Sequence, residues 1–180
     1  MDYCIFGQIF SMYRTSLLFL LLLGMLFSSC SYYDHKTKQS FYDLLSGTND
    51  SLDKMTADWH QLLEKATVTK SFSGLAPLRT KMGLFMTRNR AKIADIEVPL
   101  NSDALRDSEE VFLSTQANVI SEAYPPFEPF NDITPNEDIQ NQMKLVVSDL
   151  ESETAASAAI RKSLLAFAQR NALKIPAVIK

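Results

Sequence analysis

The chain has 180 residues, of which 46% are hydrophobic, and its formal net charge at pH 7 is -3. This length allows one folded domain and a targeting segment, and the hydrophobic fraction is that of a globular protein with a core. The small net charge excludes a general attraction to nucleic acid, so any electrostatic role has to come from local clusters of charge.

The first thirty residues have the layout of an export signal. Arg14 precedes an apolar run over residues 17–27, LLFLLLLGMLF, and two serines then lead to Cys30. The run is well short of the ~20 residues that a membrane-spanning helix needs, which favours a signal peptide over a transmembrane helix. Translation from Met12 instead of Met1 is an alternative, because Arg14 would then stand close to the new N-terminus.

Phe27-Ser28-Ser29-Cys30 resembles the lipobox of bacterial lipoproteins, in which an aliphatic residue and two small residues precede a lipidated cysteine. Phe27 departs from this pattern, since Leu is the usual residue there. The resemblance covers residues 1–30 and implies cleavage before Cys30, lipidation of Cys30 and stable anchoring by acyl chains. Ser31, in place of aspartate, implies the outer membrane. Ordinary cleavage and an uncleaved anchor are the alternatives.

The mature chain divides into a lipidated tether over residues 30–39 and a helical domain over residues 40–175. Residues 31–39 are polar and lack periodicity. Apolar residues spaced three and four apart then predict a long helix over residues 41–66, with a break near Gly47 and Asn49 as an alternative.

Three further helices are predicted. One carries Pro77 in its first turn, and the next follows Ser102 as N-cap. Thr134 and Glu137 predict a capping box for a last helix that continues to about Leu173. Because no segment has strand periodicity, we expect an all-α antiparallel bundle of about four helices, two of them long.

Charge is segregated along the chain. Residues 65–94 contain seven bases and no acid, whereas residues 95–153 contain fourteen acids and two bases. One interpretation is that basic and acidic helices pack side by side. The other is that basic side chains bind anionic lipid, lipopolysaccharide or a cell-wall polymer; the candidates are Arg79, Lys81, Arg88, Arg90 and Lys92.

The segment 124–130, YPPFEPF, combines three aromatic residues with three prolines between two predicted helices. Tyr124, Phe127 and Phe130 could cap the end of the core. Alternatively, they form a rigid docking surface for another envelope protein, because rigid aromatic side chains bind with little loss of entropy.

No catalytic, cofactor or metal site is predicted. His60 and Glu64 lie one turn apart, but two ligands are too few for a metal site, so we expect a surface pair. Met82 and Met86 suit Cu(I), yet their apolar neighbours favour core packing. Haem ligands and a Gly-x-Ser-x-Gly motif are missing from the sequence.

The sequence therefore predicts a non-enzymatic, lipid-anchored envelope protein, most consistent with the outer membrane, that binds or scaffolds a protein partner. Binding of an anionic lipid or polymer by the basic helix is the alternative. Nucleic acid is not expected as a partner, because no base-stacking aromatics stand among the bases.

Overall fold

The computed structural model describes the backbone of residues 3–175 and the side chains of residues 34–175. Its helices are α1 (Tyr3–Thr69), α2 (Leu75–Asp95), α3 (Asp103–Asn118), α4 (Asn136–Leu145) and α5 (Val147–Arg170). A π-helical turn (Val119–Ala123) and a 3-10 turn (Pro125–Phe127) connect α3 to α4. No strand occurs in this part of the chain, which confirms the predicted all-α fold. The side chains of the lipobox, with Cys30, lie outside the described residues.

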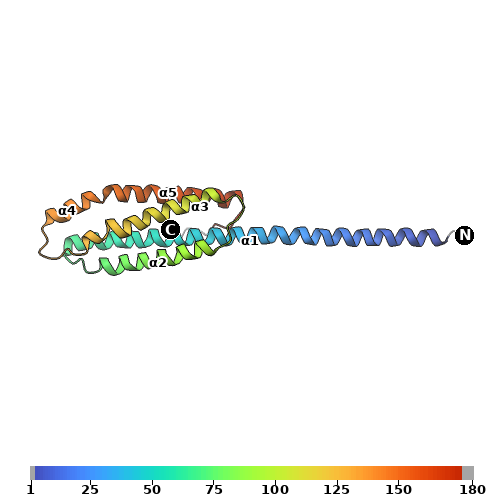
Figure 1. The fold of residues 1–180 in the computed structure, drawn as a ribbon, viewed down its shortest axis with the longest axis horizontal. Coiled ribbons are helices and arrows are strands. Elements are labelled where there is room, and N and C mark those ends of the chain that lie inside the picture. The colour runs from blue at the N-terminus through green and yellow to red at the C-terminus, as the bar shows by residue number, and fades with distance from the viewer. Residues whose placement is uncertain (1–2, 176–180) are drawn as a thin grey trace.

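The helices form an elongated bundle (Figure 1). The part of α1 from residue 34 onward packs against α2 and α5, and the most extensive contact between two helices is that of α3 with α5. The predicted last helix is split into α4 and α5 at Val146, whose backbone leaves the α-helical series while its side chain is buried. Within the described residues, no helix is long and apolar enough to cross a membrane.

Aromatic side chains fill both ends of the core. At one end Trp59 lies on Tyr124 with ring centroids 3.6 Å apart and planes 8° from parallel, and Phe127 meets Trp59 edge-on at 5.8 Å. At the other end Phe41 meets Phe167 edge-on at 6.1 Å. Met82 and Met86 are also buried, as their apolar neighbours predicted.

The predicted long helix over residues 41–66 is part of α1, without the break near Gly47 and Asn49 that the sequence left as an alternative. The helix is continuous through Gly47 and Asn49, because Asn49 is buried and its Nδ2 donates to Glu109 Oε2 at 3.0 Å instead of competing with the backbone. Residues 34–39, expected in the tether, also belong to α1. Two hydrogen bonds hold this segment on the bundle. The side-chain amide of Gln39 accepts from the Lys174 backbone N–H at 2.9 Å and donates to the Lys174 carbonyl at 3.1 Å.

The predicted capping box is wrong. Helix α4 begins at Asn136 without a side-chain cap, and Thr134 Oγ1 instead accepts a hydrogen bond from the Asn131 backbone N–H at 2.9 Å. Ser102 does precede α3, but its buried hydroxyl donates to the Pro99 carbonyl and leaves the helix N–H groups uncapped. In both cases the hydroxyl group forms its hydrogen bond within the preceding turn and not with the helix.

The segment 124–130 caps the core. Tyr124 is 1% exposed and Phe127 is fully buried, while the partly buried Phe130 packs edge-on against Phe72 and Phe127. Burial of Tyr124 and Phe127 fits the first interpretation, a cap on the core, and Phe130 alone of the three keeps exposed surface for the alternative docking role. The π-helical turn and the two prolines direct the rings inward.

Phe127→Ala is expected to destabilise the protein by about 3 kcal/mol, because the truncation leaves a cavity beneath Trp59. Urea unfolding of the protein in a non-ionic detergent measures the change. Ile133→Ala is the matched control, since Ile133 lies close in sequence but is 84% exposed. Equal unfolding free energies for the two variants would contradict the capping role.

Candidate functional site

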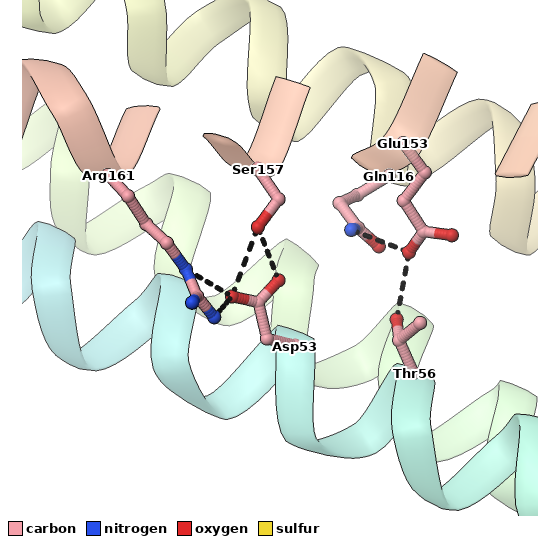
Figure 2. A network of polar contacts seen from close by, with 6 residues as sticks. All are labelled: Asp53, Thr56, Gln116, Glu153, Ser157 and Arg161. Atoms are coloured by element: carbon pink, nitrogen blue, oxygen red, sulfur yellow. Dashed lines mark hydrogen bonds and ion pairs between the residues drawn. The ribbon is translucent and has the colours of Figure 1, made fainter. Parts of the chain in front are cut away.

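Helices α1 and α5 line a groove of about 390 Å³. Six of its polar side chains come from Asp53, Thr56 and His60 of α1 and from Glu153, Ser157 and Arg161 of α5, and Thr154 of α5 is the seventh. Both sets repeat every three or four residues, so each helix presents them on one face. Figure 2 shows five of these six side chains, together with Gln116 from α3.

Asp53 connects the two helices at one end of the groove. Ser157 Oγ donates to both carboxylate oxygens of Asp53, at 3.0 and 3.2 Å, and the Arg161 guanidinium donates to Oδ2 through Nε and Nη2. The hydrogen bond and the charge of Asp53 raise the pKa of Arg161. Because the Arg161 side chain is 62% exposed, this pair orders the surface more than it stabilises the fold.

Glu153 is the buried acid of the groove, with 5% of its surface exposed. Its Oε1 accepts hydrogen bonds from Thr56 Oγ1 at 3.0 Å and from Gln116 Nε2 at 2.8 Å (Figure 2). Desolvation raises the pKa of Glu153, and the negative charge of Asp53 raises it further. No residue among 34–175 donates a hydrogen bond to its Oε2. This oxygen is not fully buried, so it keeps contact with solvent.

A second acid–amide pair lies deeper in the bundle. Glu109 on α3 accepts from Asn49 on α1, as Glu153 accepts from Gln116. Glu109 and Gln116 are seven residues apart on α3, so the two polar layers are separated by about 10 Å along the bundle. In each pair the amide oxygen, Asn49 Oδ1 or Gln116 Oε1, is buried without a partner.

Burial determines the protonation of these groups. Desolvation raises the pKa of Glu109 to about 7, although the hydrogen bond from Asn49 opposes the shift. Near neutral pH the carboxyl group is therefore neutral in a substantial fraction of molecules. Glu109 Oε1 is itself buried and unpaired, unlike the solvent-accessible Oε2 of Glu153.

His60 lies at the edge of the groove and not in the expected surface pair with Glu64. Its Nε2 is 3.4 Å from the Tyr124 hydroxyl, and its ring meets Trp59 edge-on at 5.8 Å. Burial lowers the pKa of His60, which keeps the imidazole neutral at pH 7. The part of the chain with described side chains holds no cluster of three or more His, Cys, Asp or Glu residues suited to a metal ion.

Most of the predicted basic residues of α2 form no ion pair with the acidic helix α3 among residues 34–175. Arg79 pairs with Glu128 in the turn before α4, through Nε and Nη2. The other four are exposed, and no ion pair joins them to the acids of α3; they are Lys81, Arg88, Arg90 and Lys92. Among residues 34–175, the Arg79–Glu128 pair is thus where the basic segment meets the acidic one through an ion pair.

The groove itself was not predicted from the sequence. Asp53, Glu153 and Arg161 resemble many other charged residues on amphipathic helices, and only the packing of α1 against α5 brings them together. The spacing of Glu153, Ser157 and Arg161 by four residues was the available signal, but it does not identify the facing helix.

No family model, curated protein or solved structure matches this chain. The fold and the site thus define it as an all-helical bundle with two acid–amide layers in its core and a polar groove beside one of them.

The buried acids make stability depend on pH. A carboxyl group whose pKa is raised on folding binds its proton more tightly in the folded state, so its contribution is complete below pH 4.5 and is lost as the pH rises through about 7. For Glu109 the loss is about 3 kcal/mol at most. Glu153 acts in the same direction.

Glu109→Gln is expected to remove most of this decrease between pH 4.5 and pH 8, measured by urea unfolding at each pH. Glu110→Gln, a change at the exposed neighbouring residue, is the control and should keep the wild-type slope. If the unfolding free energies of wild type and Glu109→Gln changed with pH in parallel, Glu109 would have the same pKa in the folded and unfolded states. That result would contradict the prediction.

Proposed function

We propose that this chain is a non-enzymatic lipoprotein of the bacterial envelope, anchored through Cys30, whose bundle holds its basic end against an anionic surface. The surface would consist of lipid headgroups or lipopolysaccharide phosphates. The observation that carries this proposal is the position of the basic residues of α2 relative to the start of the bundle in α1.

The end of the bundle nearest Asp34 gathers bases from three separate segments. Helix α2 ends there, and the hydrogen bonds between Gln39 and Lys174 bring the end of the described chain to the same place (Figure 1). Acids also occur there: Asp34, which pairs with Lys38, and Asp43, Asp95, Glu97 and Asp103. The bases of this end are Lys36, Lys38, Arg88, Arg90, Lys92, Arg170 and Lys174.

This basic end is also the end closest to the proposed lipid. Cys30 precedes Asp34 by four residues, which span at most about 14 Å even when extended. Exposed charges near an anionic membrane act within a Debye length of about 10 Å, and each Lys or Arg contributes about 1 kcal/mol there. The acyl chains would supply most of the anchoring, and the basic residues would orient the bundle.

Scaffolding of a protein partner is the second candidate function, and the opposite end of the bundle favours it. Helix α4 and the turns before it lie there (Figure 1) and expose Ile133 and Leu145, which are 84% and 70% accessible. The exposed acids around them are Glu122, Asp132, Glu137, Asp138, Asp149 and Glu151. On an anchored bundle this end would point away from the membrane.

The basic end can be tested with residues 31–180, which lack the lipid, and vesicles containing phosphatidylglycerol. Arg88→Glu combined with Arg90→Glu is expected to lower co-sedimentation by at least about tenfold, because two attractive charges become repulsive. Added salt should weaken wild-type binding. Lys65→Glu with Lys144→Glu makes the same change of charge at the far end, and an equal loss in both variants would contradict the proposal.

The anchor has its own test. Cys30→Ala is expected to abolish incorporation of radiolabelled palmitate in bacterial cells and to release the protein from the membrane fraction. Cys4→Ala is the matched control and should label normally, because Cys4 precedes the proposed cleavage point. Labelling of the Cys30→Ala variant at the wild-type level would disprove the lipoprotein assignment.

A further inference from the structure

The groove between α1 and α5 has an unused acceptor at its buried acid. Its hydroxyl groups already donate elsewhere: Thr56 to Glu153, Ser157 to Asp53, and Thr154 to the Leu150 carbonyl at 2.8 Å. Glu153 Oε2 receives none of these hydrogen bonds. A ligand that binds to this oxygen must therefore carry its own N–H or O–H donor.

The charges of the groove favour a cation. Arg161 is hydrogen-bonded to Asp53, and His60 is neutral at pH 7. No positively charged side chain that lines the groove therefore pairs with Glu153. An anionic ligand would meet both Asp53 and Glu153. A cation would instead compensate the buried carboxylate, where the low local dielectric strengthens the attraction.

The walls of the groove also limit the shape of the ligand. Its volume of about 390 Å³ is at the lower end of the range for small-molecule sites. Ala57, Leu150 and Ala158 give it an apolar side, and a second depression that shares Leu150 and Ala158 extends along α5 to Val147. A short alkyl group would lie along this surface.

We propose that the α1/α5 groove binds a small organic ammonium ion. The ammonium group donates to Glu153 Oε2, while Thr56 and Gln116 hold Oε1 in place, and the alkyl chain lies against Leu150, Ala57 and Ala158. This site lies apart from the basic α2 residues and does not depend on the membrane-binding function.

The test uses n-butylammonium as the probe and the full-length protein in a non-ionic detergent. Trp59 is the only tryptophan of the chain and contacts His60 at the edge of the groove, so its fluorescence reports on the site. Calorimetry confirms the stoichiometry. We expect saturable binding of one equivalent, with n-butanol and n-butyrate binding at least about tenfold more weakly because neither compensates the carboxylate.

Two variants and one control separate a ligand site from a purely structural acid. Glu153→Gln keeps an oxygen that can accept from Thr56 and Gln116 but removes the charge, and it should lose at least about tenfold in affinity. Asp149→Asn, the same charge change at an exposed residue of α5, should bind as wild type does. Ala57→Leu fills the groove from an exposed position and should block binding with the fold intact.

Failure of wild type to saturate would overturn the proposal, as would equal binding of n-butanol. Unchanged affinity in the Glu153→Gln protein would also overturn it. If the Glu153→Gln protein does not fold, the Ala57→Leu protein tests the proposal instead. A folded Ala57→Leu protein that still binds the probe would show that binding occurs outside the groove, and the proposal would be wrong.

Discussion

The stack of Trp59 on Tyr124 sets the axial position of α1 in the bundle. The two rings are 3.6 Å apart and nearly parallel, and both are 1% exposed. Because Tyr124 follows directly after the π-helical turn that extends α3, the stack fixes α1 relative to α3. Thr56, about one turn before Trp59, then meets Glu153, and Asn49, about three turns before it, meets Glu109. The polar contacts of the core depend on this register.

The two acid–amide layers are alike in chemistry but differ in access. Each buries a carboxyl group that accepts from a carboxamide, and each leaves an amide oxygen without a partner. Desolvation raises the pKa of both carboxyl groups. Glu109 is closed on all sides, whereas Glu153 borders the groove. The first layer is thus closed to solvent, and the second borders the groove in which we propose that a cation binds.

The proposed functions belong to different positions along the length of the bundle. Bases from α1, α2, the end of α5 and Lys174 lie with several acids at the end nearest Asp34, and the other end exposes acids together with Ile133 and Leu145. The groove lies between these ends, where residues 53–60 of α1 face residues 150–161 of α5. An anchored bundle of this kind could lie on an anionic surface and keep both the groove and its far end accessible.

The sequence by itself determined the periodic features. Apolar residues spaced three and four apart predicted helices throughout, Met82 and Met86 were correctly placed in the core, and Pro77 lies in the first turn of α2. These features depend on residues within a few turns of one another. Tertiary structure alone decided that Glu153 is buried while Asp149, on the same helix, is exposed. Desolvation and charge compensation are set by neighbouring helices, and the order of helices around a bundle is not encoded in the periodicity of any one of them.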